Sequence, residues 1–279
     1  MLRLLGERGV LLTPNGRLGR AVERIAAVNR DPATLHTMDD AEAALLLEAN
    51  RDVYDAFIAT YALIERPREP PSMSLEKFLC FEEGADLPAH DGNPGARNTQ
   101  FELLSGAHLI LGGGEITPVE PDYSLEYGGA RVGVAVKRLT SINPNTLNTR
   151  LRGAADQLAG TYGTGFVVLN LDGWLTNLDF DKAEEVGRQF ETDLLEAYKP
   201  LARVGGRRPA VLGFIILGTW LSWHKDGGHR SLVWKGPFQV IGLADSDEAK
   251  GRLDSYFEGF SRTWQASMTA AGALLAPAT

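Results

Sequence analysis

Hydrophobic residues recur at helical spacing through the first 88 residues of the chain, which predicts a mostly helical region there. The longest predicted helix runs from about residue 40 to residue 65 and ends before a proline-rich segment. One side of this helix carries the apolar residues Leu47, Tyr54, Phe57, Ile58 and Tyr61. Thr37 and Asp40 resemble a capping box at its start. We expect the apolar side chains to lie in the core of an N-terminal helical region, residues 1–88.

The pattern changes after a polar, turn-rich stretch, residues 83–95, which we interpret as a linker. Helical and extended patterns then alternate to the end of the chain. The expected helices are 98–109, 145–162, 181–198 and a last one that is capped by Asp245 and Glu248; the expected strands are 117–127, 130–138, 165–171, 210–220 and 231–243. This order predicts a second domain, residues 95–279, of the α/β or α+β class, with a central mixed sheet flanked by helices.

A hairpin is expected where Gly128 and Gly129 separate two extended runs, because two glycines fit the turn that joins antiparallel strands. If these glycines are the central turn residues, Asp122 pairs with Ala135 on the opposite strand. Directly opposed Cβ atoms lie about 5 Å apart. Lys137 lies two residues beyond Ala135 and therefore shares its face of the sheet. The hairpin thus brings a carboxylate and an ammonium group together.

By the same arithmetic Glu120 opposes Lys137, so one face gathers Glu120, Asp122 and Lys137 around Ala135. The valines that alternate with these residues should point to the opposite, buried face; they are Val132, Val134 and Val136. Two interpretations are open. The cluster is either a cross-strand ion pair on a solvated face, or a site for phosphodiester hydrolysis. Hydrolysis needs a Lewis acid such as Mg²⁺, which binds carboxylate oxygens, and a lysine that stabilises developing negative charge.

Composition and charge restrict the function. The net charge is -8, which argues against a protein that coats nucleic acid with its whole surface. Residues 128–160 nevertheless hold five basic residues and one acidic residue, which is compatible with a local basic groove, although this excess alone fits an ordinary solvated face equally well or better. The chain has no long apolar run and no clear signal peptide, so we expect no membrane span. One cysteine, Cys80, excludes an internal disulfide framework, and we expect a cytoplasmic protein.

The order of several short motifs resembles the PD-(D/E)XK (restriction-endonuclease-like) nuclease superfamily. The motifs are Asn98-x-x-Phe101-Glu102-Leu103, Glu120-Pro121-Asp122, Val136-Lys137-Arg138 and Ala154-Ala155-Asp156-Gln157. Together they cover about 75 residues, from Arg97 to Leu171. The resemblance implies a restriction-endonuclease-like core and an Mg²⁺-dependent endonuclease, a hydrolase that cuts DNA. It also implies a homodimer or larger homo-oligomer, because such cores cut duplex DNA most easily with one site per strand.

The resemblance also assigns roles to individual residues. Glu102 and Asp122 would be metal ligands, and Glu120 is a further candidate ligand. Lys137 would be the catalytic lysine, and Gln157 would match a polar residue that some members place on the next helix. The residues implied to contact nucleic acid are Arg97, Arg138, Arg150 and Arg152. The expected cofactor is Mg²⁺, with Mn²⁺ as a substitute.

Ala135 departs from the family pattern, which has Glu or Asp two residues before the lysine. Alanine supplies no metal ligand, so hydrolysis by this chain should be weak. Three explanations are open: an inactivating substitution of an active parent, which the intact remainder of the site favours; a natural degenerate nuclease that binds nucleic acid or a protein without cutting; or replacement of the missing oxygen by Glu120. The sequence therefore predicts a DNA nuclease core that is inactivated at position 135, with a binding module as the alternative.

Overall fold

The computed structural model describes residues 2–7, 9–65, 75–92, 94–139, 144–170, 180–202, 211–217, 220–226, 229–235, 238–243 and 246–275. The chain forms two compact units. The first unit contains residues 1–67, 72–107 and 221–235, and the second contains residues 68–71, 108–220 and 236–279. The predicted domains 1–88 and 95–279 do not coincide with these units, because part of the helix that begins at Gly95 and residues 221–235 belong to the first unit.

The first unit is mainly helical, as its sequence pattern indicates. Its helical elements are α1 (Leu2–Glu7), α2 (Arg17–Arg30), α3 (Thr34–Thr37), α4 (Asp40–Thr60), a π-helical turn (Tyr61–Glu65), two 3-10 helices (Leu75–Phe81 and Pro88–His90) and the first part of α5 (Gly95–Leu111). Strands β6 (Trp220–Asp226) and β7 (His229–Lys235) form a separate two-stranded sheet.

The capping box of α4 is formed by Asp39 and Glu42, so the predicted pair, Thr37 and Asp40, was wrong. The Asp39 carboxylate accepts the backbone N–H of Glu42 at 2.8 Å, and the Glu42 carboxylate accepts the N–H of Asp39 at 3.1 Å. In a capping box, a Glu or Gln side chain at the third helical position accepts the backbone N–H of the N-cap residue. Glu42 meets this requirement for a helix that is capped by Asp39.

The second unit is built on a six-stranded mixed sheet with the strand order β1-β2-β3-β4-β5-β8. The strands are β1 (Ile116–Val119), β2 (Asp122–Tyr127), β3 (Ala130–Arg138), β4 (Gly165–Asn170), β5 (Val211–Leu217) and β8 (Phe238–Gly242). The first three strands are antiparallel, β3, β4 and β5 are parallel, and β8 is antiparallel to β5. The prediction of an α/β core with a mixed sheet flanked by helices is therefore confirmed.

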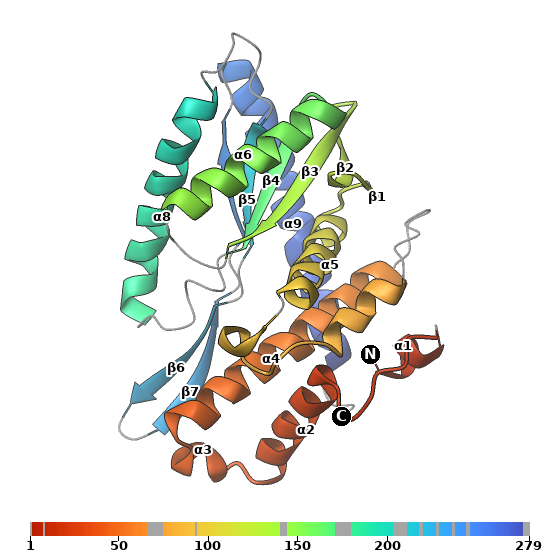
Figure 1. The fold of residues 1–279 in the computed structure, drawn as a ribbon, viewed down its shortest axis with the longest axis vertical. Helices are drawn as coiled ribbons and strands as arrows, with labels where there is room; N and C mark the ends of the chain where they lie inside the picture. Colours follow the sequence, from red (N-terminus) through yellow and green to blue (C-terminus); the bar gives the residue numbers. More distant parts are fainter. Residues whose placement is uncertain are drawn as a thin grey trace. The chain divides into compact units, whose positions relative to one another are not determined.

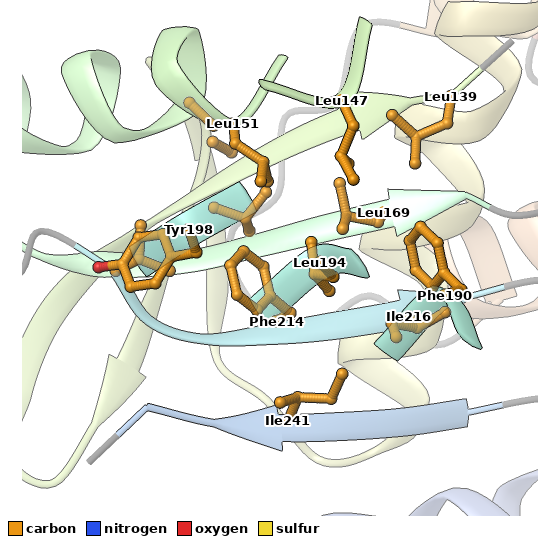
Figure 2. Close-up of a cluster of buried hydrophobic side chains, with 14 of the residues drawn as sticks. Leu139, Leu147, Leu151, Leu169, Phe190, Leu194, Tyr198, Phe214, Ile216 and Ile241 are labelled. Carbon is orange, nitrogen blue, oxygen red and sulfur yellow. The ribbon is translucent and has the colours of Figure 1, made fainter. Parts of the chain in front are cut away.

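Helices cover both faces of this sheet (Figure 1). Helices α6 (Pro144–Thr161) and α8 (Phe180–Ala202) pack on one face, and α9 (Asp247–Leu275) lies on the other. Figure 2 shows the apolar core under α6 and α8, in which leucines from α6 meet aromatic side chains from α8 and β5. On the opposite face, Phe166 of β4 and Phe257 of α9 contact each other edge to face, with ring centroids 5.5 Å apart.

The C-terminal third differs from its prediction in two respects. Two strands, 210–220 and 231–243, were expected in this region, and four strands, β5 to β8, occur; most of β6 lies between the two predicted ranges. Asp245, the predicted cap of the last helix, lies outside the described residues. Ser246 takes a capping position, since its hydroxyl accepts the N–H of Ala249 at 3.2 Å. No helix in the described part of the chain has both the length and the apolar composition that a bilayer crossing requires.

Candidate functional site

The predicted hairpin register is confirmed. Tyr127 pairs with Ala130, and Tyr123 pairs with Val134, so the same alignment places residue 122 against residue 135 at the next step. Both turn glycines have positive φ angles, 61° for Gly128 and 77° for Gly129. A two-residue turn with two positive φ angles matches the twist of a hairpin, and residues other than glycine adopt it only at a cost.

Asp122 and Lys137 lie together at the end of this hairpin that is remote from its turn. Oδ2 of Asp122 accepts the backbone N–H of Val136 at 2.7 Å. The Lys137 Nζ is 4.0 Å from the same oxygen. The two side chains are 16% and 20% exposed, for Lys137 and Asp122 respectively. A backbone amide of the neighbouring strand therefore fixes the carboxylate, and solvent still reaches both charged groups.

Ala135 lies inside the apolar core, where an open, solvated face was expected. It is fully buried. Its cluster includes Leu151, Ala154 and Leu158 of α6 and Val167 of β4. The prediction of one open and one buried face was wrong, because helices cover both faces of the sheet. Asp122 and Lys137, which lie at strand ends, are partly exposed.

Glu120 does not oppose Lys137. The predicted strand 117–127 is divided into β1 and β2, and Val119 pairs with Asp122. Glu120 and Pro121 are the two turn residues between these strands, and the peptide bond between them is cis. Glu120 is consequently exposed in a turn. The predicted pairing of Glu120 with Lys137 was therefore wrong, and so was the prediction that Glu120 lies on the sheet face of Ala135.

Lys137 and Arg138 point to opposite faces of the sheet. Lys137 shares its face with Ala135 and with the core under α6 and α8, whereas Arg138 belongs to the face of Val134 and Val136. Arg138 is half-buried and pairs in parallel register with Asn170, the last residue of β4. Asn170 is 3% exposed. Asn170 was not among the predicted site residues, although it is the one polar side chain in the strand sequence GFVVLN.

Glu102 lies on α5 in the first unit, where its carboxylate pairs with the Lys77 ammonium group. Asp122 and Lys137 belong to the second unit. The proposed metal-ligand pair, Glu102 and Asp122, is therefore divided between the units and stays a prediction. Lys77 was not expected as a partner, because it precedes the predicted linker and lies 25 positions before Glu102.

Arg97 is unsuited to the predicted contact with nucleic acid. Its side chain is 5% exposed, and it donates to Asp91 at 2.9 Å and to Asp52 at 3.3 Å. The guanidinium group is thus already paired with carboxylates of the same chain and is not available to a phosphate group. Asp91 also accepts the N–H of Ala85, so the segment that was predicted to be a linker, 83–95, is attached to the start of α5.

The remaining predicted residues lie on α6. Gln157, Arg150 and Arg152 are all exposed. The side of α6 that faces the sheet is apolar and includes Leu151, Ala154 and Leu158. Because Gln157 lies outside this side, the structure gives it no place in the core beside Ala135. Arg150 and Arg152 are accessible, which their predicted contact with a nucleic-acid backbone requires.

Few oxygen donors are available for the expected magnesium ion. Mg²⁺ commonly takes one or two carboxylates together with waters and phosphate oxygens. Asp122 supplies one carboxylate in the second unit, and Glu102 is a candidate in the first. Within the described residues, no three His, Cys, Asp or Glu side chains are grouped so that they could hold a metal ion. Mg²⁺ therefore stays a prediction, with Asp122 as the candidate ligand in the second unit.

Comparison with protein families, with characterised proteins and with solved structures gave no match to this chain. The resemblance to PD-(D/E)XK nucleases thus rests on the motifs of this sequence. The geometry that bears on it is the Asp122–Lys137 pair at the end of the hairpin.

Proposed function

We propose that this chain is a nuclease of the PD-(D/E)XK type that acts on DNA, and that Ala135 weakens its hydrolysis of phosphodiester bonds. The observation that carries the proposal is the position of the Lys137 ammonium group, 4.0 Å from the Asp122 carboxylate at an accessible strand end. The succession of helix, hairpin, helix and parallel strand in a mixed sheet supports it. A restriction-endonuclease-like fold is part of this proposal.

The chain's own residues would act as follows. Asp122, which is fixed by the Val136 N–H, would hold Mg²⁺. When bound, the metal supplies a Lewis acid and lowers the pKa of a bound water. Lys137 would donate a hydrogen bond to a phosphate oxygen and stabilise the negative charge that develops there. Arg150 and Arg152 would contact the DNA backbone.

A carboxylate is missing from this set at position 135. The burial of Ala135 means that its replacement by an acid would place a charge among leucines, and Glu120 lies in a turn away from this position. We therefore propose slow hydrolysis by the chain as it stands. A homodimer belongs to the same proposal, since a duplex offers two strands and each chain has one site. A cytoplasmic location agrees with the single cysteine, Cys80.

The test is cleavage of supercoiled plasmid and of linear DNA with Mg²⁺ or Mn²⁺. We expect slow, metal-dependent nicking by the unaltered chain and none by Lys137→Ala or Asp122→Asn. Ala135→Glu should raise the rate at least about tenfold in the fraction that folds, because general acid–base and metal groups each contribute factors of this size or more. Circular dichroism of each variant separates loss of activity from loss of fold. The absence of cleavage by all folded variants, Ala135→Glu included, would contradict the proposal.

A second candidate function is a binding module on a degenerate nuclease core. The observation that favours it is the complete burial of Ala135 among apolar side chains, where the core is closed around a methyl group. This candidate predicts DNA binding that weakens with salt and persists without metal. It also predicts that Ala135→Glu never cleaves, even when it folds. If Lys137→Ala and Arg138→Ala both leave DNA binding unchanged, each candidate function loses its support.

A further inference from the structure

We propose that the hairpin of β6 and β7 binds a zinc ion through His224, Asp226 and His229. The observation behind this site is the juxtaposition of two histidines and one aspartate on one face of a two-stranded sheet, next to its turn. The site is independent of the proposed function, because these three residues belong to the first unit, whereas Asp122 and Lys137 belong to the second.

The bounds of the two strands give their register. β6 and β7 form a sheet of their own, and each strand has seven residues. Two residues, 227 and 228, lie between them in the sequence, so the strands are antiparallel neighbours (Figure 1). The length of the connection fixes the register of a hairpin, and a two-residue connection pairs Asp226 with His229. The outer ends of the two equally long strands then coincide.

The pleat of the strands places the three residues on one face. Alternate residues of a strand share a face, so His224 lies on the face of Asp226. His229 lies on it too, because directly paired residues share a face. Paired positions have Cβ atoms about 5 Å apart, positions two apart in one strand lie roughly 7 Å apart, and diagonal positions about 7–8 Å apart. Histidine and aspartate are long enough to reach a common ion from positions with these separations.

The residue types suit zinc. Zn²⁺ binds imidazole nitrogen at about 2.0–2.1 Å and carboxylate oxygen at about 2.0–2.2 Å, in tetrahedral geometry. Two imidazoles and one carboxylate fill three positions, and the fourth stays open for water or another ligand. Mg²⁺ prefers oxygen donors, so this ion differs from the one proposed for Asp122. The described side chains include no group of three such ligands, and the side chains of β6 and β7 are not among them.

A bound ion would stabilise the hairpin. A sheet of only two strands is marginally stable by itself. An ion that binds the paired strands but not the unfolded chain adds its binding free energy to the stability of the folded state. The alternative is a cross-strand ion pair between Asp226 and His229, which needs no metal and leaves His224 without a role.

Zinc binding by the full chain tests this site. After treatment with EDTA and dialysis, isothermal titration calorimetry should show one Zn²⁺ ion per chain. His224→Ala and His229→Ala should each weaken binding at least about tenfold, because loss of an outer-shell partner of a ligand already weakens metal binding about 10- to 100-fold. Asp226→Asn, which keeps the shape of the side chain, should weaken binding in the same direction. His90→Ala is the matched control, since His90 is an exposed histidine of the same unit.

Two added histidines test the assignment of the face. Ser231→His adds an imidazole opposite His224 on the same face and should tighten zinc binding by filling the open position. Arg230→His adds one on the other face and should leave the affinity unchanged. Circular dichroism of each variant checks that it folds. The site is overturned if the unaltered chain binds no Zn²⁺, if His90→Ala weakens binding as much as His224→Ala does, or if the two added histidines have equal effects.

Discussion

The two units of the chain differ in whether charged side chains lie in their interior. All six buried Asp, Glu and Arg side chains in the described part of the chain belong to the first unit; they are Arg17, Glu48, Arg51, Asp52, Asp55 and Arg97. In the described part of the second unit, the buried polar residues are His108, Ser124, Asn170 and Ser267, and none of them is Asp, Glu, Lys or Arg. The first unit therefore has a partly ionic interior, and the second has an apolar one.

The ionic interior of the first unit is a connected network. Asp52 accepts hydrogen bonds from Arg17 at 2.7 Å, from Gln100 at 3.1 Å and from Arg97 at 3.3 Å. Arg17 also donates to the carbonyl oxygen of Cys80 at 2.9 Å. Burial lowers the pKa of Arg17, whereas Asp52 raises it. The network joins α2, α4 and α5, and its charges are directed at one another.

The second unit keeps its charges at the strand ends. Asp122 and Lys137 are partly exposed, and the sheet between the helices is filled by residues such as Val167 and Phe214. A ligand can contact partly exposed charged side chains such as these, whereas the buried network around Asp52 in the first unit is closed to it. Burial therefore distinguishes charged side chains with a structural role from those that a ligand can reach, and the residue types alone do not make this distinction.

Removal of the Asp52 carboxylate should have the largest effect on this comparison. Asp52→Ala leaves Arg17 and Arg97 without their shared partner in a buried place, and breaking a buried ion pair in this way costs about 3–5 kcal/mol. Urea denaturation should show this loss. Glu23→Ala is the matched control: its partner is Arg30, both side chains are largely exposed, and the loss should stay within about 1 kcal/mol. Equal effects of both variants would contradict the structural role of burial.

Introducing a charge into the second unit should have the next largest effect. Ala135→Glu adds volume to a closed apolar core and buries a carboxyl group, and we expect a loss of about 2–4 kcal/mol. Ala130→Glu adds the same group at an exposed position on the same strand and should cost less than about 0.5 kcal/mol. A similar, small loss in both variants would mean that position 135 can accept an acidic residue, which would favour an active parent enzyme.

His108 makes the second unit sensitive to acid. Its Nδ1 accepts a hydrogen bond from Trp264 Nε1 at 2.9 Å, and burial lowers the pKa of His108 from 6.5 to about 4. Between these values the unfolded chain binds the extra proton and the folded chain does not. Stabilisation is therefore complete above about pH 6.5 and is lost as the pH falls to about 4, by up to about 3 kcal/mol. Urea denaturation between pH 7 and pH 4 measures the loss.

His108→Gln serves as the control for this pH dependence. Glutamine also offers an acceptor to Trp264 and does not titrate, so the variant should lose less stability between pH 7 and pH 4 than the unaltered chain does. Identical pH profiles for the two proteins would show that other groups are responsible.

Local signals in the sequence were sufficient for the helices and for the hairpin. The period of the apolar residues predicted α4, and Gly128-Gly129 predicted the pairing of β2 with β3, because turn geometry and register follow from neighbouring residues. The same local patterns placed Asp122 beside Lys137 before the fold was known. They also placed Glu120 on the strand, since the division between β1 and β2 has no glycine and interrupts the extended pattern for only two residues.

What depends on distant partners was missed. Arg17 meets residues 35 and 83 positions away, Asp52 and Gln100, and no periodicity relates such positions. Charged residues are rarely buried, so the pattern favoured an exposed Arg97. The alternation in β3 identified two faces, but the covering of both faces by α6, α8 and α9 is a tertiary feature. For this reason Ala135 was expected to be accessible.

The smallest expected effect concerns a hydroxyl group beside the candidate site. Ser124 lies two residues after Asp122 on β2, is 1% exposed, and its Oγ has no hydrogen-bond partner among the described residues. A buried hydroxyl group without a hydrogen-bond partner lowers the stability of the folded state. Ser124 pairs with Gly133, around which the side chains are closely packed, so the smaller alanine should leave little empty space. Ser124→Ala should therefore stabilise the chain by up to about 1 kcal/mol in urea denaturation, without changing DNA binding. A loss of stability above about 1 kcal/mol would mean that the Ser124 hydroxyl makes a hydrogen bond in solution. The interior of the second unit would then contain a bonded polar group and would not be purely apolar.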